Sequence, residues 1–273
     1  MEIEEKRYYQ YVAIILIYRN YEDLEECINS MKQNISSCQI IVVNAYFDDK
    51  SYRKIKEISE KHFCDFLNIP NKGYSYGNNK GVKYAENKYD YEYIIISNPD
   101  IVIRSFGKSL PKYDVIAPKI TNVRGALQNP MMIRKSKFNA YLIYLGFKTN
   151  IVVITYLGIV LNKLSNTLLK IFIGKKDDYR IYMAHGSFVL INQNVIKAFH
   201  HIYDEKMFLF AEECVLAEKT RRKKFVTGYT EKICVLHKED GSMKLSNLSI
   251  NKELKKANIY FYEKYLSWKG APK

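Results

Sequence analysis

Residues 71–100 contain the side chains whose types and order most clearly indicate chemistry. A loop rich in glycine and asparagine, 71–81, is followed after a helical interval by the apolar run 93–97, which ends on Asn98-Pro99-Asp100. Glycine and asparagine let a backbone approach a ligand closely, and a carboxylate at the carboxyl end of an apolar strand lies where open α/β sheets bind ligands. Because Mg²⁺ is usually held by one or two carboxylates together with substrate phosphates, this stretch is typical of a site for an anionic nucleotide. The simpler alternative is a turn, since Asn, Pro and Asp are all turn formers.

Two further groups are candidates for chemistry. Glu212 and Glu213 are adjacent carboxylates, and His237 follows the apolar run 233–236. Two glutamates can also stand at a helix N-terminus, where the helix dipole stabilises them, and a single histidine after a strand can be structural. The residues alone leave these alternatives open.

The elements that must position these groups follow from periodicity. Short apolar runs at 11–17, 39–43, 93–97 and 187–191 have the length and composition of strands, whereas 22–33, 51–61 and 78–87 have apolar residues at helical spacing. Strands that alternate with helices predict an α/β fold with a mainly parallel central sheet flanked by helices. No internal repeat or linker is visible in the 273 residues, so we expect one domain.

In this order, the blocks resemble glycosyltransferase family 2, the inverting enzymes of the GT-A fold. The resemblance is greatest to the rhamnosyltransferase-like branch, in which the Asp-any-Asp motif reads Asn-Pro-Asp. It covers roughly residues 10–265, and 130–180 only poorly. The blocks that carry it are 11–28, 40–51, 71–81, 98–100, 186–191, 203–213 and His237 with Gly241-Ser242. It implies a single domain over 1–273, with a nucleotide-sugar-binding half at 10–110, an acceptor half at 111–246 with a helical insertion at about 138–173, and a C-terminal helix in 247–273.

The resemblance also implies roles for individual residues. Asp100 and His237 are the expected ligands of Mn²⁺ or Mg²⁺, with Asn98 as a neutral third ligand, and this neutral side chain predicts weak metal binding. Glu213 is expected to be the general base, with Glu212 as its partner in the acidic pair. The residues expected to contact the donor are Tyr18, Asn44, Asp49, Asn71, Gly73, Asn79, Asn98 and Gln128.

The formal charge of +14 is concentrated in one segment. No acidic residue lies between Asp114 and Asp177, and within this interval apolar residues recur three or four apart over 151–171, with lysines on another face. This pattern predicts an amphipathic helical insertion that lies on an anionic membrane surface. The alternative is a helical hairpin packed on the enzyme's own core or on a second subunit. A membrane-crossing helix is not expected, because the longest uncharged run is 149–162.

The densest basic run, 219–224, raises the question of nucleic acid. No recognition helix, zinc finger or aromatic RNA-reading motif accompanies it, so we expect a solvated helix face and no nucleic-acid partner. The tail 249–268 is basic and aromatic; it is expected either to clamp a lipid-linked acceptor or to cover the sheet.

Five cysteines without metal-type or paired spacing indicate a reduced compartment, and the acidic residues 1–5 differ from a signal peptide. We therefore expect a cytoplasmic protein, peripheral on the inner face of the membrane. The expected reaction moves a sugar from dTDP-rhamnose or a UDP-hexose to a hydroxyl of a growing surface polysaccharide, such as capsule or O-antigen, on a polyprenyl diphosphate. Homo-oligomerisation stays open. The alternative is a non-catalytic basic α/β protein that binds membrane or nucleic acid and retains the fold.

Overall fold

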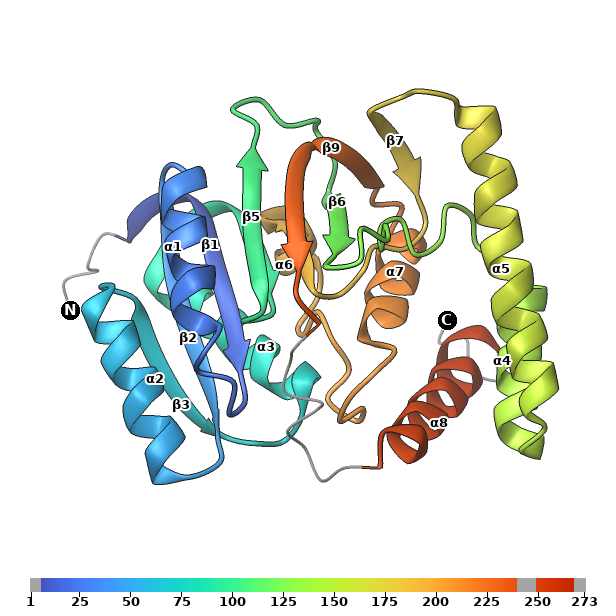
Figure 1. Ribbon diagram of the computed structural model, residues 1–273, viewed down its shortest axis with the longest axis horizontal. Coiled ribbons are helices and arrows are strands. Elements are labelled where there is room, and N and C mark those ends of the chain that lie inside the picture. The colour runs from blue at the N-terminus through green and yellow to red at the C-terminus, as the bar shows by residue number, and fades with distance from the viewer. Residues whose placement is uncertain (1–5, 240–248, 268–273) are drawn as a thin grey trace.

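The computed structural model describes residues 6–239 and 249–267 (Figure 1). In this part of the chain, nine strands form one sheet in the order β3-β2-β1-β4-β8-β6-β9-β5, and β7 also pairs with β9. The strands are β1 (Arg7–Ile17), β2 (Cys38–Tyr46), β3 (Asp65–Pro70), β4 (Tyr89–Ser97), β5 (Ile101–Phe106), β6 (Val115–Asn122), β7 (Asp178–Ile181), β8 (Phe188–Asn192) and β9 (Thr227–His237).

Parallel pairing is concentrated in one half of the sheet. Strands β3, β2, β1 and β4 are parallel to one another, so their carboxyl ends share one edge. The other half is mixed: β8 is antiparallel to β4 and β6, β9 is parallel to β6, and β5 and β7 are antiparallel to β9. As a consequence β5, which the sequence assigns to the donor half, lies at the far edge of the sheet from β3.

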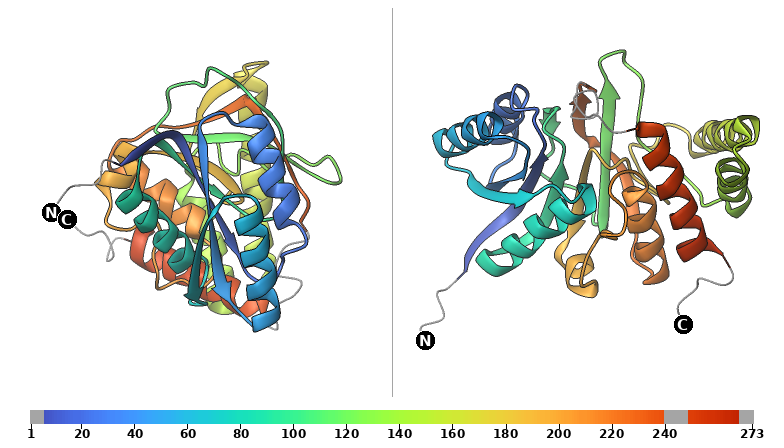
Figure 2. Two further views of the ribbon diagram at one scale, coloured as in Figure 1. Left: turned by 90° about the vertical axis from the view of Figure 1, so that its left-hand side faces the viewer. Right: turned by 90° about the horizontal axis from the view of Figure 1, so that it is seen from below.

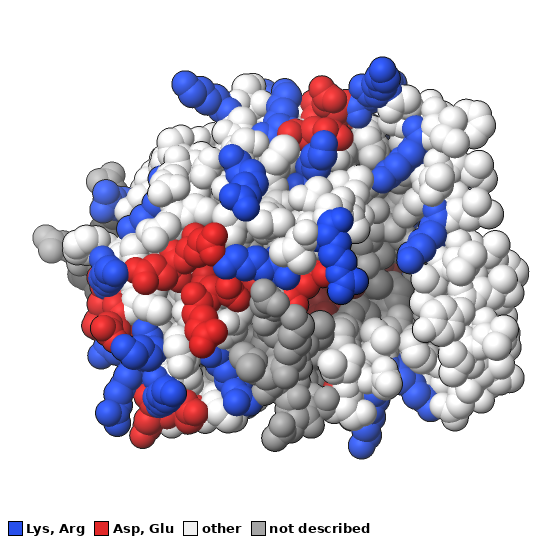
Figure 3. All heavy atoms as spheres, viewed as in Figure 1, with Lys and Arg blue, Asp and Glu red and all other residues white. Residues whose placement is uncertain are grey.

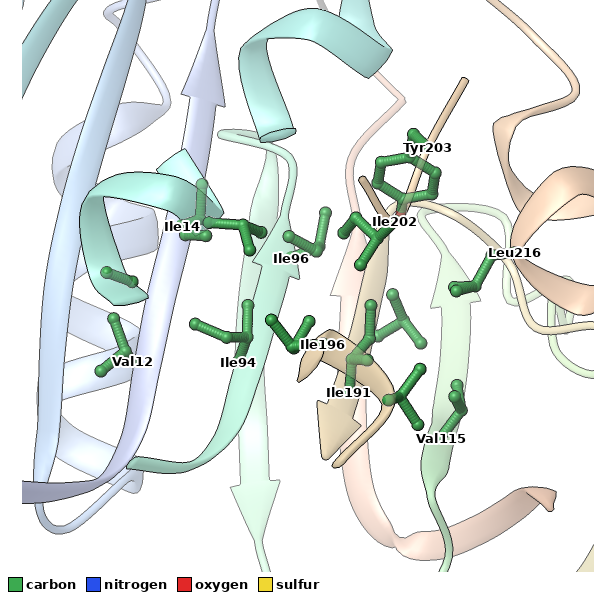
Figure 4. Close-up of a cluster of buried hydrophobic side chains, with 14 of the residues drawn as sticks. Val12, Ile14, Ile94, Ile96, Val115, Ile191, Ile196, Ile202, Tyr203 and Leu216 are labelled. Carbon is green, nitrogen blue, oxygen red and sulfur yellow. The ribbon is translucent and has the colours of Figure 1, made fainter. Parts of the chain in front are cut away.

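Helices cover both faces of the sheet (Figure 2). They are α1 (Leu24–Asn34), α2 (Asp49–Lys61), α3 (Tyr74–Lys88), α4 (Lys137–Thr149), α5 (Val152–Ile173), α6 (Gln193–Ala198), α7 (Glu212–Arg222) and α8 (Ile250–Phe261), which continues into a π-helical turn, η1 (Tyr262–Leu266). Along β1 the side chains alternate between two cores: Val12 and Ile14 face α3, whereas Ala13 and Ile15 face α1. Figure 4 shows the first of these cores.

The first core joins the two halves of the sheet. Ile14, Ile94 and Ile96 meet Ile191 and Leu216 in one buried cluster that runs from β1 through β8 to α7. Because both faces are covered, these strands are almost continuously apolar, as expected for a buried parallel sheet. The predicted α/β class with helices on both faces is confirmed. Its division into a donor half, an acceptor half and a C-terminal helix stays a prediction.

The predicted helical insertion is a hairpin of α4 and α5. Asn150 joins the two helices in a left-handed conformation, with φ of +59°. The helices are in close contact: a Cβ at Gly146 would lie 2.2 Å from Thr155 Oγ1, and one at Gly158 would lie 2.8 Å from Ile143 Cγ1. A larger residue at either glycine would push the helices apart.

One side of this hairpin is exposed and apolar. Val153, Val160 and Leu164 are 76%, 56% and 52% exposed, and Figure 3 shows this region, on the right, as a surface with few charged side chains and bordering basic ones. Among the described residues, α5 is the one helix long and apolar enough to cross a membrane by length and composition, and only 11% of its apolar window is buried. The uncharged run 149–162 is therefore shorter than the apolar length of α5, because the helix continues past Lys163 and Lys170 to Ile173.

Candidate active site

The carboxyl ends of β1, β2 and β4 bring together residues predicted to contact the donor. Ile17 pairs with Asn44, and Ile15 pairs with Ser97, so Tyr18 and Asn98, which follow β1 and β4, lie at the same edge as Asn44 in β2. Tyr18 packs edge-on against Phe47, with 5.6 Å between the ring centroids. This edge therefore combines an aromatic surface with amide groups.

Asn44 has one satisfied and one unsatisfied end. Its Nδ2 donates to Asn68 Oδ1 over 2.7 Å, whereas its Oδ1 is buried and has no hydrogen-bond partner among the described residues. A buried acceptor is costly when unpaired, so this oxygen suits a ligand N–H or hydroxyl. Asp49 is further out on the surface, where its Oδ1 accepts from the hydroxyl of Tyr46 over 2.8 Å.

The glycine-rich loop contacts the protein itself. Gly73 has φ of +101°, and an added Cβ would lie 2.3 Å from the carbonyl oxygen of Phe208. The backbone at Gly73, which was predicted to lie close to a ligand, thus lies close to Phe208, in the segment that precedes Glu212 and Glu213. Asn71 supports the same loop, because its Oδ1 accepts from the Gly73 N–H over 3.2 Å.

Asn79 joins α3 to that same segment. Its Oδ1 accepts from the Tyr203 N–H, and its Nδ2 lies 3.1 Å from both the Tyr203 carbonyl oxygen and Glu205 Oε1. Its side chain is 7% exposed. These contacts use the amide fully, and its predicted contact with the nucleotide-sugar stays a prediction.

Asp100 and His237 meet at the end of β4 and β9. Asp100 is 2% exposed, and its Oδ1 has no hydrogen-bond partner within the described residues. Its Oδ2 lies 3.5 Å from His237 Nε2. The two are adjacent because β9 pairs with β5, which starts right after Asp100 and sets Ile101 opposite His237.

Gln128 orients the His237 ring. Its Oε1 lies 2.8 Å from His237 Nδ1, and its Nε2 donates to Glu239 Oε1 over 2.7 Å. Since an amide oxygen only accepts, Nδ1 is the donor in this contact, and Nε2 is the ring nitrogen that faces Asp100. Gln128, predicted near the donor sugar, thus contacts the imidazole.

This geometry fits two protein ligands of a hard divalent cation. An unpartnered carboxylate oxygen and an imidazole lone pair are suitable donors, and an outer partner such as Gln128 is typical of a metal-binding histidine. Asn98 Oδ1 lies 3.3 Å from the Tyr74 hydroxyl. No group of three or more His, Cys, Asp or Glu in residues 6–239 and 249–267 could hold a metal ion. The remaining ligands would therefore come from substrate phosphates.

His185 belongs to the same cluster, and sequence reasoning missed it. Its ring lies edge-on to that of His237, with centroids 5.6 Å apart, and its Nδ1 is 2.8 Å from Ser187 Oγ. Burial, together with His237, lowers the pKa of His185 to about 4, so the ring is neutral at physiological pH. Its position directly before Gly186-Ser187, a block that carried the family resemblance, was the available signal.

The acidic pair, Glu212 and Glu213, forms the start of α7. Glu212 is 4% exposed, and its Oε1 lacks a hydrogen-bond partner in the described structure. Burial and the neighbouring Glu213 raise the pKa of Glu212 to about 8, and burial also raises the pKa of Glu213. Glu213 is only half-buried, and an added Cβ at Gly186 would lie 3.7 Å from its Oε2.

The segment 185–187 therefore lies close to two chemical groups. The ring of His185 lies beside that of His237, and Gly186 lies near the Glu213 carboxylate. The Tyr74 hydroxyl lies 2.9 Å from the Gly186 carbonyl oxygen and 3.3 Å from Asn98 Oδ1. A cation-type site and a carboxylate thus both lie close to one short segment.

A cavity of about 670 Å³ opens beside Glu213. This volume lies within the roughly 300–1,000 Å³ of small-molecule sites. Gln128, His185 and Glu213 line it at one end, and α4, α5 and α8 supply most of its other walls. The tail predicted to clamp an acceptor or cover the sheet does line this cavity, through Phe261 and Tyr262; Gly241, Ser242 and Trp268 lie outside the described residues.

The basic run 219–224 makes internal contacts. Arg221 and Arg222 both pair with the buried Glu218, at 2.8 and 3.0 Å, and Lys135 joins them at 2.7 Å. Lys219 Nζ donates to the carbonyl oxygen of His201 over 2.6 Å. These contacts give much of the run a structural role.

Comparison with known proteins matches part of the chain to a glycosyltransferase family. Residues 12–105 match the model of Glycosyl transferase family 2. A curated relative, the low-salt glycan biosynthesis hexosyltransferase Agl10 of Haloferax volcanii, is 23% identical over 236 residues, which are 84% of this chain and 67% of that protein.

Solved structures show the fold. GalNAc-T7, solved with UDP, GalNAc and Mn²⁺, superimposes with a TM-score of 0.62 at 10% identity, over 96% of this chain and 49% of that one. Residues 1–349 of S. aureus TarS give 0.53 at 12% identity, over 84% and 60% of the two chains. The mannosyltransferase PcManGT of Pyrobaculum calidifontis, solved with GDP-Man and Mn²⁺, gives 0.50 at 9% identity, over 85% and 57%. This chain thus spans about half to three fifths of the length of these neighbours.

Together, the family match over residues 12–105 and the fold support a family 2 glycosyltransferase with the GT-A fold.

Proposed function

We propose that the protein transfers a sugar, with inversion, from a nucleoside diphosphate donor to a hydroxyl of a growing glycan. The observation that carries this proposal is that one short segment, 185–187, lies close both to the Asp100–His237 pair and to Glu213. Glycosyl transfer needs both: a site for the charge of the departing diphosphate, and a base for the attacking hydroxyl.

The donor would occupy the edge at β1, β2 and β4. Tyr18 and Phe47 offer an aromatic surface for the base, and the unpartnered Oδ1 of Asn44 offers an acceptor. Asp100 and His237 would hold Mn²⁺ or Mg²⁺ against the diphosphate, where the cation would neutralise charge on the leaving group. The neighbours solved with Mn²⁺ support this assignment.

Glu213 would act on the acceptor. Its carboxylate takes the proton of the attacking hydroxyl as the new bond to the anomeric carbon forms and the bond to the diphosphate breaks. A base on the face opposite the leaving group gives inversion, as in inverting glycosidases. The neutral His185 adds no positive charge beside the cation site.

The donor sugar is a hexose or a deoxyhexose in this proposal. The hexosyltransferase relative and the neighbours solved with UDP and with GDP-Man support a hexose, whereas the Asn-Pro-Asp form of the motif favours dTDP-rhamnose. Calorimetric titration with UDP, dTDP and GDP, each with and without Mn²⁺, followed by hydrolysis of the matching sugar donors, separates these choices. No metal-dependent binding of any of the three would contradict the proposal.

The acceptor is proposed to be a polyprenyl-diphosphate-linked glycan, reached from the inner surface of the cell membrane. The exposed apolar side of α5 and the absence of acidic residues from 115 to 176 support this placement. Each basic residue near an anionic bilayer contributes on the order of 1 kcal/mol, so a few lysines beside an apolar helix face suffice for reversible binding.

Vesicle sedimentation tests the membrane contact. The protein should pellet with anionic phosphatidylglycerol vesicles but not with neutral ones, and less so at high salt. Leu164→Gln with Leu168→Gln should reduce pelleting, whereas Phe63→Gln, at a more exposed but distant apolar residue, should not. Pelleting that ignores lipid charge, together with a dimer that the α5 variant dissociates, would show that this face packs on a second subunit.

A further inference from the structure

One wall of the cavity, formed by α5, is basic. Lys163 and Lys170 both line it, seven residues apart on the same face of α5. Lys135 also lines it but pairs with Glu218, at 2.7 Å. For Lys163 and Lys170, no ion pair or side-chain hydrogen bond is found in the described parts of the chain, so these two ammonium groups are the available ones.

The surroundings of these lysines favour an anionic ligand. Lys170 is half-buried, and its burial lowers its pKa more than the charge of Glu231 raises it, so its ammonium group is only partly compensated. No acidic residue lies within 40 positions before Lys163 in the sequence, since the acid-free interval begins after Asp114. The polar side chains of Asn162 and Thr167 line the same wall. An oxyanion bound here would supply the missing negative charge.

Other walls of the cavity are apolar. Ile143 of α4, Ile159 of α5, and Phe261 and Leu266 of the C-terminal elements line the cavity. Ile159 is also 37% exposed on the outer surface of α5, next to the more exposed Val160. The cavity wall therefore continues into the apolar face that the hairpin presents to its surroundings, so a hydrocarbon chain could leave the cavity along α5 without passing through water.

From this juxtaposition we infer a subsite for the lipid diphosphate of the acceptor. Lys163 and Lys170 bind the diphosphate, the apolar walls of α4, α5 and η1 contact the first isoprene units, and the glycan extends toward Glu213. The inference rests on the proposed glycosyl transfer, because it names the acceptor's position in that same cavity. A ligand with both a diphosphate and a hydrocarbon chain can contact the lysines and the apolar walls together, whereas a ligand with either part alone contacts only one of them.

Calorimetry with three soluble probes tests this subsite in the absence of vesicles. The full chain is titrated with geranyl diphosphate, inorganic diphosphate and geraniol. Geranyl diphosphate should bind at least about tenfold more tightly than either of the other two, because it alone uses both the lysines and the apolar walls. Equal binding of inorganic diphosphate would show a plain phosphate site, and equal binding of geraniol would show a plain apolar site; either result overturns the inference.

Two matched double variants complete the experiment. Lys163→Gln with Lys170→Gln should weaken geranyl diphosphate binding about tenfold or more, whereas Lys175→Gln with Lys176→Gln, at exposed lysines just after α5 that do not line the cavity, should leave it unchanged. Thermal melting verifies that both variants are folded. Equal loss in both pairs, or in neither, overturns the assignment. Donor binding by the wild type is measured separately, so failure of the subsite is distinguishable from failure of the proposed function.

Discussion

The edge formed by β1, β2 and β4 and the hairpin of α4 and α5 place their side chains by different means. At the edge, buried parallel strands fix the backbone, and residues such as Asn44 and Asp100 are almost inaccessible. The hairpin is attached mainly through one face of α4, by stacking of Tyr144 on Tyr262 at 4.3 Å and by the Lys148–Glu263 ion pair at 2.7 Å. The first region, with fixed and buried side chains, suits a small donor of one kind. The second, attached at one face, suits a larger acceptor that enters from solvent or from a membrane.

The largest effect is expected at the buried edge. Asp100→Ala should abolish turnover and weaken nucleoside diphosphate binding only when Mn²⁺ is present, because it removes the carboxylate oxygen that has no protein partner. Calorimetry with and without Mn²⁺ measures this. Asp90→Ala, an exposed aspartate at the opposite end of the same strand, is the control and should change neither quantity. Unchanged metal-dependent binding by Asp100→Ala would remove the cation from this site.

A large effect on kcat is expected on the acceptor side. Glu213→Gln should lower kcat by about 10²–10⁴, the usual contribution of a general base, with donor affinity nearly intact. Since burial raises the pKa of Glu213, the wild-type kcat should rise with pH above the ordinary range of a glutamate, as the base form is gained. If Glu212→Gln is the more damaging change in steady-state kinetics, the base is the other member of the pair.

A smaller effect is expected from the residue that orients the histidine. Gln128→Leu removes the acceptor that fixes the proton on Nδ1 of His237, and outer partners of metal-binding histidines typically contribute 10–100-fold to metal affinity. Titration of Mn²⁺ in the presence of the nucleoside diphosphate should show a loss of about this size, and Gln128→Glu, which keeps an acceptor oxygen, should restore part of it. Metal affinity that is unaffected by Gln128→Leu would return Gln128 to its predicted place near the donor sugar.

The smallest effect concerns stability. The pKa of Glu212 is raised to about 8, so the folded state holds this proton to higher pH than the unfolded chain does. The contribution of Glu212 to the unfolding free energy is therefore fully present below about pH 4.5 and is lost as the pH rises toward 8. Glu212→Gln removes this decline, so its melting temperature should exceed that of the wild type increasingly from pH 5 to pH 8.

The exposed Glu57→Gln is the control for this series, because its side chain is 68% exposed. Its melting temperature should follow that of the wild type at each pH. A difference between Glu212→Gln and wild type that stays constant with pH would show that Glu212 is ionised in the folded protein.

The sequence by itself determined three of the parallel strands and the identity of their chemical groups. The apolar runs at 11–17, 39–43 and 93–97 became β1, β2 and β4, because strand length, β-branched content and flanking turn residues are local properties; β3 was not predicted. The turn after β4 likewise indicated Asp100. The long, acid-free hairpin could also be predicted, since helical periodicity is local.

Only the tertiary structure decided which of these groups meet. His185 lies beside His237, and Gln128 contacts His237 across 109 positions, because the strand order β4-β8-β6-β9 brings distant segments together. The same strand order brings Asn79 to the backbone of Tyr203, which it binds, and brings Gly73 close to Phe208. Local patterns report burial and secondary structure, whereas pairing across a mixed sheet depends on crossovers that the sequence does not encode locally.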